Sequence, residues 1–477
     1  MAIVNINVSV TNPPKPSQLL KSGALVSVGG TTLTAGSYQL LSSKDDLKSI
    51  LAPAKTITAL AWATNVVTVT LSAPHGWTTG DSVPVVISGA APTAYNGAFT
   101  ATVTSSTAFT YPLNSDPGTA TTMGTVTTVN ALEIQQMNSA YWTQGTNRAV
   151  YVLELGDVSN TDAVDALSDF IDEDIALGNT YQTFFSYLVP REFADEATFK
   201  TLTGLYTSPS SLVYFFVTTT IAGYADWVAT GNKSVCAGVE SPTIAASEFS
   251  MAAVFQSSLS NDPGSSNQVP PMAWRFMYGV TEYPPAGNST LLKTLQDNSI
   301  NYIGSAAEGG LSNKMLVAGH MLDGNPFNYW YSVAWAAINL ELDLANEVIN
   351  GSNTNINPLY YEQNGIDRLQ NRALKTLRNG ISYGLILGQS VGTKLTQTDF
   401  NAEYEKGTYA GNAVINAVPF SSYTSLNPSD YQDGKYNGLS AVITPRRGFE
   451  SITFNVNVTN FVGGVKKWET QWCLRAF

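Results

Sequence analysis

Charged side chains are scarce in this sequence. Asp, Glu, Lys and Arg together make up 13% of its 477 residues, about half the share that is usual in soluble domains. Hydrophobic residues (44%) and aromatic residues (11%) are present in ordinary amounts, enough for roughly two to four domains with cores of their own. A surface with so few charged side chains indicates a protein that covers itself with other copies, or a secreted protein rich in Thr, Ser and Asn.

Cysteine and histidine are also scarce, with two of each. Cys236 and Cys473 are too few for a disulfide framework or a zinc cluster, so we expect two unpaired thiols. His75 lies in a turn and His320 follows a predicted strand, and neither has a Cys, Asp or Glu partner at ligand spacing. We therefore expect turn or packing roles for both histidines, and no metal site.

The motifs of common enzymes are missing. The chain has no Gly-x-Ser-x-Gly elbow, no Walker loop, no Gly-x-Gly-x-x-Gly fingerprint and no His-Glu-x-x-His. Its nearest imitation of a phosphate loop, Gly231-Asn232-Lys233-Ser234, lacks the upstream glycine and a following helix. We predict no enzymatic activity, no catalytic residues and no cofactor.

Features of secreted, membrane and nucleic-acid-binding proteins are lacking as well. The first residues do not have the basic and apolar regions of a signal peptide, and the most apolar helical stretch, 333–340, is too short to span a bilayer. A net charge of −12 argues against nucleic acid, because phosphate contacts need a basic surface. We expect a protein that is assembled in the cytoplasm, without membrane insertion and without a nucleic-acid partner.

Segments with the period-2 alternation of a β-strand occur near both ends of the chain. Near the start, apolar residues alternate with Asn, Ser and Thr, and near the end the same pattern returns: Val4, Ile6, Val8, Val10, and then Phe454, Val456, Val458. The first strand runs into Pro13-Pro14-Lys15-Pro16, which can neither rejoin a sheet nor start a helix at once. The prolines therefore hold this strand away from the body of the protein.

Between these ends the sequence predicts an α/β (α+β) multidomain protein that carries an inserted all-β domain, either a small sandwich or a barrel. Its strands are expected at 66–71, 82–87, 98–104, 107–111 and 124–129, followed by apolar strands that alternate with amphipathic helices. Two long helices are expected at about 328–350 and 362–387, with Gly351 as the stop of the first. The predicted segments are an N-terminal strand and arm (1–20), the start of the body (21–55), the inserted domain (56–130), an α/β middle domain (131–310), a C-terminal domain (311–462) and a tail (463–477).

Two helices have opposite charge on one face. In the predicted helix 161–177 the acidic residues share a face opposite Val164 and Leu167: Asp162, Asp165, Asp169, Asp172, Glu173. In the second long helix the basic residues form a stripe: Arg368, Arg372, Lys375, Arg378. The two faces fit self-association through complementary charge, although a solvated helix face explains each of them equally well.

The order of these parts resembles the tail sheath proteins of contractile-tailed phages. The residues that carry the resemblance are the run from Gly324 to Tyr331 (Gly-Asn-Pro-Phe-Asn-Tyr-Trp-Tyr), the helix through Glu341 and Glu347, the basic helix, and Pro445-Arg446-Arg447-Gly448-Phe449 with its strand. The resemblance implies a subunit that exchanges its terminal strands with neighbouring subunits, polymerises helically around a tail tube and contracts by rigid-body repacking. It makes the basic stripe a candidate for contact with the tube or with a neighbour. The implied partners are neighbouring subunits, the tube protein, and baseplate and neck or terminator proteins, in a virion tail.

Two questions stay open at this point. The tail after Gly463-Gly464 does not match the family pattern, so either 451–459 or this tail is the exchanged C-terminal strand. The alternative function is a secreted or surface carbohydrate-binding or adhesive protein, suggested by the Thr-rich inserted domain and by tryptophans expected at its surface, such as Trp77.

Overall fold

The fold was analysed in a computed structural model. It describes most of the chain between residues 22 and 474: 22–145, 148–176, 183–209, 211–242, 249–264, 266–305, 313–450, 454–458 and 470–474, without the side chains of 173–176 and of the last two segments. The predicted N-terminal strand, with Val4, Ile6, Val8 and Val10, lies outside the described residues.

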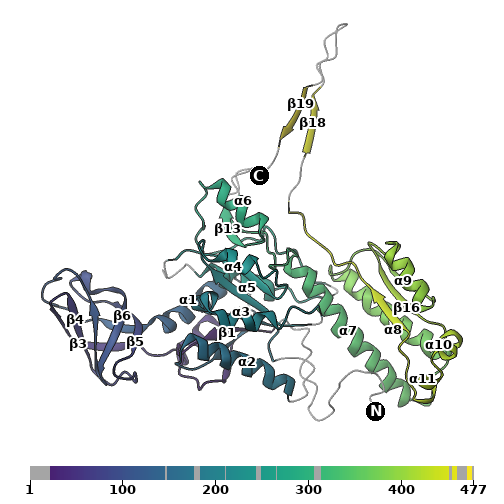
Figure 1. Ribbon diagram of the computed structural model, residues 1–477, viewed down its shortest axis with the longest axis horizontal. Coiled ribbons are helices and arrows are strands. Elements are labelled where there is room, and N and C mark those ends of the chain that lie inside the picture. The colour runs from purple at the N-terminus through teal and green to yellow at the C-terminus, as the bar shows by residue number, and fades with distance from the viewer. Residues whose placement is uncertain are drawn as a thin grey trace, which may run out of the picture.

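A six-stranded sheet forms the centre of the body (Figure 1). The strand order is β12-β11-β10-β1-β9-β2, parallel except for the antiparallel edge strand β2. Side chains of β1, β9, β10, β11 and β12 are almost entirely buried, as their apolar sequences require. The bounds are β1 (Gly23–Ser27), β2 (Tyr38–Leu41), β9 (Val150–Glu154), β10 (Ser186–Leu188), β11 (Tyr214–Thr219) and β12 (Val235–Val239).

Helices cover both faces of this sheet, because alternate strand residues point to opposite sides. Leu25 and Phe216 face a core shared with α1 and α5, whereas Val26 and Phe215 face a core shared with α2, α3 and α4. The predicted α/β layer with a buried sheet is thus present. The bounds are α1 (Val129–Thr143), α2 (Asn160–Ala176), α3 (Ala197–Gly204), α4 (Tyr224–Val228) and α5 (Ser250–Leu259), with short 3₁₀ turns η1 (Lys44–Ser49) and η3 (Arg191–Asp195).

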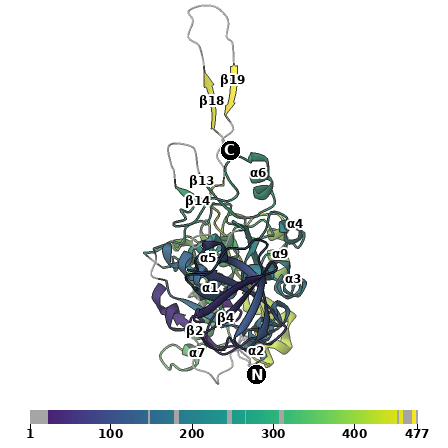
Figure 2. The same cartoon turned by 90° about the vertical axis from the view of Figure 1, so that its left-hand side faces the viewer.

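A closed barrel is attached at one end of the body (Figures 1 and 2). The chain leaves the six-stranded sheet after β2, forms the barrel in the order β3-β4-β7-β6-β5-β8, and returns to the sheet through α1. Val67, Val85 and Phe109 are fully buried inside it. The bounds are β3 (Lys55–Ala63), β4 (Val66–Leu71), β5 (Ser82–Ser88), β6 (Gly97–Ser105), β7 (Ala108–Pro112) and β8 (Thr125–Thr128), with the turn η2 (Thr93–Tyr95).

The barrel joins the body without a linker on its C-terminal side. Thr128, the last residue of β8, is also the N-cap of α1, and its side chain accepts a hydrogen bond from the backbone N–H of Ala131 at 3.1 Å. On the other side, Ala52 donates its backbone N–H to the carbonyl oxygen of Gly30 at 3.0 Å, close to where β3 begins. Both connections are therefore short and tied to the body.

The C-terminal part of the body is built on two long antiparallel helices, α7 (Phe327–Ser352) and α8 (Gln363–Ser382), and a three-stranded sheet against α8. In this sheet β16 lies between β15, which is parallel to it, and β17, which is antiparallel. The remaining bounds are α6 (Ser289–Asp297), β13 (Tyr302–Ser305), β14 (Lys314–Val317), β15 (Ser390–Thr393), α9 (Gln397–Glu405), β16 (Ala413–Ala417), α10 (Phe420–Leu426), α11 (Pro428–Gln432), β17 (Leu439–Val442), β18 (Phe454–Val458) and β19 (Thr470–Leu474).

Two predicted helix ends are wrong. Gly351 does not stop α7, which continues to Ser352; it is buried, and a Cβ atom there would lie 2.4 Å from the Cβ of Leu359. Glycine is needed at this position for close packing rather than for a turn. The second helix ends at Ser382 instead of 387, because Gly384 has a φ of 79° and the chain turns there.

Candidate assembly site

The strand that contains Phe454, Val456 and Val458 does not stand alone. It is β18, and it pairs antiparallel with β19 in the tail of the same chain, from Phe454 opposite Leu474 to Val458 opposite Thr470. The two segments that sequence treated as rivals for the C-terminal exchanged strand are therefore the two strands of one hairpin.

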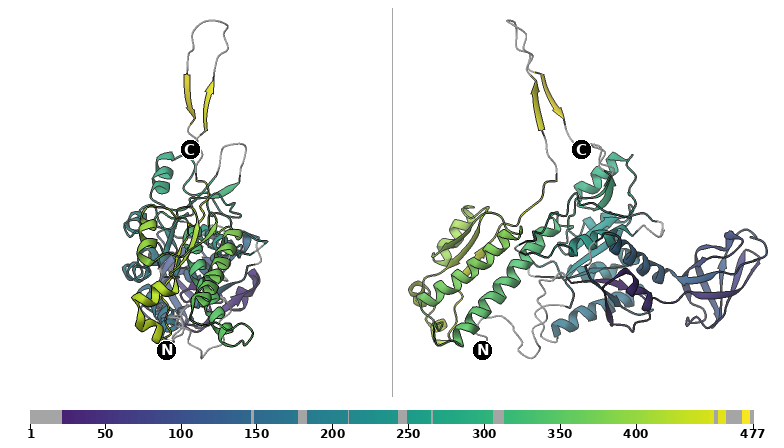
Figure 3. Two further views of the ribbon diagram at one scale, coloured as in Figure 1. Left: turned by 90° about the vertical axis from the view of Figure 1, so that its right-hand side faces the viewer. Right: turned by 180° about the vertical axis from the view of Figure 1, so that it is seen from behind.

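This hairpin stands clear of the body (Figure 3). Within the described part of the chain, β18 and β19 form a two-stranded sheet, and neither pairs with a third strand. Each strand thus has one edge whose backbone donors and acceptors have no strand beside them. Open edges of this kind are templates for pairing with another chain.

A strap of residues 443–450 carries the chain from β17 toward this hairpin. Its first part is held by backbone pairing: Leu387 donates to the carbonyl oxygen of Thr444 at 2.8 Å, and Arg446 donates to that of Leu385 at 2.9 Å. Gly448 passes close to Pro271, where a Cβ atom would lie 2.5 Å from the proline Cβ. The strap therefore lies directly on the body up to this residue.

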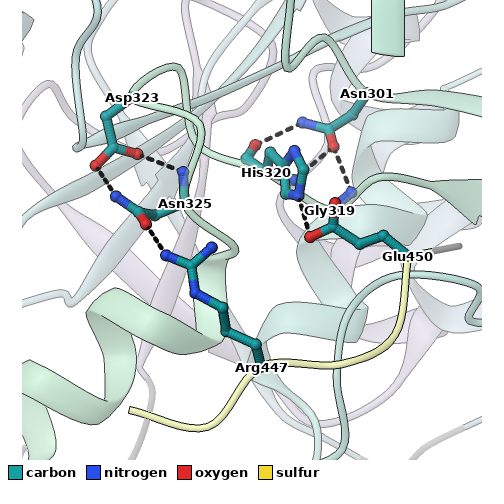
Figure 4. Close-up of polar contacts among 7 residues, drawn as sticks. All are labelled: Asn301, Gly319, His320, Asp323, Asn325, Arg447 and Glu450. Atoms are coloured by element: carbon teal, nitrogen blue, oxygen red, sulfur yellow. Dashed lines mark hydrogen bonds and ion pairs between the residues drawn. The ribbon is translucent and has the colours of Figure 1, made fainter. Parts of the chain in front are cut away.

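Two side-chain contacts hold the last part of the strap (Figure 4). The guanidinium group of Arg447 donates to Oδ1 of Asn325 and lies 5.2 Å from the centroid of the Tyr329 ring. A carboxylate oxygen of Glu450, Oε1, lies 2.9 Å from Nε2 of His320. Because an ionised carboxylate only accepts hydrogen bonds, Nε2 of this imidazole is the donor.

The body residues that receive these contacts are themselves fixed. The side chain and backbone of Asn325 donate to the carboxylate of Asp323, at 2.8 and 3.0 Å. Asn301, which is completely buried, accepts from the backbone of His320 at 2.9 Å and donates to its carbonyl oxygen at 2.8 Å. The partners of Arg447 and Glu450 are thus held in place by contacts within the body.

The basic stripe is divided between internal and external roles. Arg368 donates through Nε to Glu347 of α7 at 2.5 Å, and Arg372 forms an ion pair with Asp343, also on α7. Lys375 and Arg378 are exposed. Sequence reasoning missed Asp343 and Glu347 as partners, although their spacing of four residues on a helix places them on one face.

The acidic face of α2 lies where sequence placed it. Asp162, Asp165, Asp169 and Asp172 are exposed, whereas Val164, Leu167 and Ile171 are fully buried against the sheet. Asp162 also accepts a hydrogen bond from the hydroxyl of Ser159 at 2.7 Å, at the start of the helix. The side chain of Glu173 lies outside the described residues.

Buried glutamates that sequence did not identify lie near the carboxyl ends of the parallel strands. Burial, together with the neighbouring Glu192, raises the pKa of Glu133 well above its usual range, and burial raises the pKa of Glu240 despite the nearby Arg191. Glu133 accepts a hydrogen bond from the backbone N–H of Arg191 at 2.9 Å, and Glu240 accepts one from the hydroxyl of Ser250 at 3.2 Å. These contacts fix loops. In the part of the chain that the structure describes, no group of three or more His, Cys, Asp or Glu residues is arranged to hold a metal ion.

His75 and Trp77 have packing roles within the barrel. Nε2 of His75 lies 2.7 Å from the carbonyl oxygen of Ser105, and its ring stacks on Trp77 at a centroid distance of 4.6 Å. Trp77 is half-buried and also packs against Phe109 in the barrel core. The expectation of an exposed tryptophan at this position is therefore wrong.

Comparisons with known proteins complete the description of the site. A scan against protein-family models found no match, and a search of curated proteins found none either. Among solved structures, the chain is similar to a sheath tail protein from Listeria innocua, with 9% sequence identity, 95% of each chain covered and a TM-score of 0.40. None of the described helices is long and apolar enough to cross a membrane.

Proposed function

We propose that this chain is a structural subunit of a phage-type contractile tail sheath. The observation that carries the proposal is the C-terminal hairpin, which stands clear of the body with an open edge on each strand. An isolated two-stranded hairpin is at best marginally stable in water. A hairpin that is held away from its own sheets gains stability when it adds to a sheet of another chain, where backbone hydrogen bonds supply the affinity.

A receiving sheet exists in the same chain. The sheet β15-β16-β17 has only three strands in the described part of the chain, and β15 and β17 are its two edges. A hairpin of one copy that adds to an edge of this sheet in the next copy makes a head-to-tail contact. Repeated contacts of this kind produce a helical filament when the rotation does not close a ring.

The terminal strand near residue 1 has the second role in this proposal. Its alternating pattern and the following prolines suit exchange with a neighbour, and Val4, Ile6, Val8 and Val10 remain the predicted contact residues. By resemblance to the sheath family, the filament surrounds a tube and contracts by rigid-body repacking, with the exchanged strands as tethers. Lys375 and Arg378 are then the residues of the basic stripe best exposed for contact with the tube or with a neighbouring subunit.

Further partners are implied by the same resemblance: the tube protein, and baseplate and neck or terminator proteins, in a virion tail. The low share of charged residues, 13%, fits a surface that is largely covered in the assembly. A carbohydrate-binding role is less well supported, because Trp77 packs within the barrel and does not form an exposed platform.

Negative-stain electron microscopy of the purified full chain tests the proposal. Tubes or rings are expected, and a monodisperse monomer at high concentration would contradict it. Deletion of residues 1–12 should leave a folded protein that no longer forms tubes, whereas normal tubes from this variant would refute exchange of the N-terminal strand.

A further inference from the structure

The last part of the strap differs from its first part in what holds it. Residues 444 and 446 exchange backbone hydrogen bonds with 385–387, as in a sheet. Among the described residues, the backbone groups of 447–450 form no backbone–backbone hydrogen bond. The contacts that hold this part of the strap are the close approach of Gly448 to Pro271 and the side-chain contacts of Arg447 and Glu450.

The strap also lies beside empty space. An open pocket of about 340 Å³ is lined by Arg447, Gly448 and Glu450 of the strap together with residues of the body, among them Gln268 and Ala318. Close packing normally fixes a segment in one position, and a gap on one side removes that restraint. The strap therefore has room to move if its side-chain contacts are lost.

We propose that Arg447 and Glu450 form a two-point latch that sets the direction in which the C-terminal hairpin leaves the body. Arg447 fastens the strap to Asn325 and the Tyr329 ring at the start of α7, and Glu450 fastens it to His320 beside β14. Two contacts on different elements fix an orientation, whereas a single contact leaves a pivot. The latch belongs to the single chain and does not depend on the proposed function.

The arrangement of the two contacts suits release. The side chain of Glu450 is 41% exposed, so solvent reaches its carboxylate. The side chain of its partner His320 is 9% exposed and stays with the body. A single side-chain contact contributes little when one of its members is solvated, because water competes for the carboxylate. A partner chain that pulls on the hairpin can therefore open the latch without unfolding the body.

Distance measurement between spin labels tests the latch in the full chain, at concentrations where microscopy shows no tubes. One label is placed on Cys473 in β19, and the second on an introduced cysteine, either S289C on α6 or N371C on α8; Cys236 is 1% exposed and stays unlabelled. The unmodified latch should give a narrow distance distribution from both body positions. The double variant R447Q/E450Q should broaden both distributions at least twofold, and each single variant should broaden them less.

The matched control removes one positive and one negative charge elsewhere: D45N/K48Q, an exposed ion pair of 2.7 Å on η1. It should leave both distributions narrow, and thermal unfolding of the body should be the same in all variants. A narrow distribution in R447Q/E450Q, or a broad one with the latch intact, would overturn the proposal. Tube formation is a separate measurement, so failure of the sheath proposal would not be mistaken for failure of the latch.

Discussion

The barrel and the C-terminal hairpin are both β-structures rich in small polar and β-branched residues, yet they solve the problem of strand edges in opposite ways. Every barrel strand lies between two others, because the order β3-β4-β7-β6-β5-β8 closes on itself. Each described hairpin strand has one neighbour. Closure abolishes edges, and an open hairpin presents them. The barrel is complete within one chain, whereas the open edges of the hairpin are available for the pairing with another chain that we propose.

The largest expected difference concerns assembly. Deletion of residues 451–477 should abolish tube formation completely. Replacement of residues 56–125 by a short Gly-Ser linker should preserve it, because Lys55 and Val126 are paired across β3 and β8 and their ends are easily joined. Electron microscopy of both variants measures this. Tubes from the first variant would refute the role of the hairpin, and the loss of tubes from the second would give the barrel an assembly role.

A second prediction concerns whether the barrel and the hairpin each fold without the body. A fragment of residues 53–129 should fold by itself, because its core of Val67, Val85 and Phe109 lies entirely within it. A fragment of residues 450–477 should remain unfolded, since a lone hairpin lacks a core. Amide NMR spectra distinguish the outcomes: a folded fragment gives dispersed amide proton signals, and an unfolded fragment gives collapsed ones. A collapsed spectrum from the barrel fragment would show that strand closure alone does not make the unit independent.

A third prediction compares how much stability is lost when a phenylalanine ring is removed from the barrel and from the strap. Phe109→Ala removes a completely buried ring and should lower the free energy of unfolding of the barrel by about 3–5 kcal/mol. The matched change Phe449→Ala, in the strap, removes a ring that is 80% exposed and should cost no more than about 0.5 kcal/mol. Urea unfolding measures both. A large loss from Phe449→Ala would mean that this ring packs against something in the single chain.

A smaller effect than that of Phe109→Ala is expected at Lys233, a buried basic residue where the central sheet meets α7. Burial lowers the pKa of Lys233 to about 8; its ammonium group donates to the carbonyl oxygen of Ser211 at 2.8 Å and lies 4.8 Å from the Trp330 ring centroid. Between about pH 8 and the ordinary pKa of lysine, about 10.4, the unfolded chain binds more protons, so this group makes stability rise with pH.

Lys233→Met keeps the volume and removes that titration. At pH 7 it should stabilise the protein by on the order of 1–2 kcal/mol, after allowance for the hydrogen bond that is lost. The advantage should shrink as pH approaches 10. Urea unfolding at several pH values checks the trend, and an advantage that grew with pH would contradict it.

Elements with a clear periodicity were predictable, and buried elements without one were not. The expected strand runs of the barrel overlap β4 to β8, and both long helices were found. Helix α1 was not predicted because its polar residues Glu133, Gln136 and Asn138 are buried, so no apolar stripe marks it. Between Arg191 and Gly204 the chain forms η3 and α3 rather than one continuous helix, because Glu196 between them has an extended ψ of 120°.

The sequence by itself determined which segments alternate, which helix faces carry charge, and that the chain has few charges to place on its surface. Only the tertiary structure decided partners. Backbone hydrogen bonds are the same for any strand, so the pattern of Phe454, Val456 and Val458 does not specify β19 as their neighbour. Likewise, a stripe of cations does not reveal that Arg368 and Arg372 face carboxylates of α7, because the packing of two helices creates that contact.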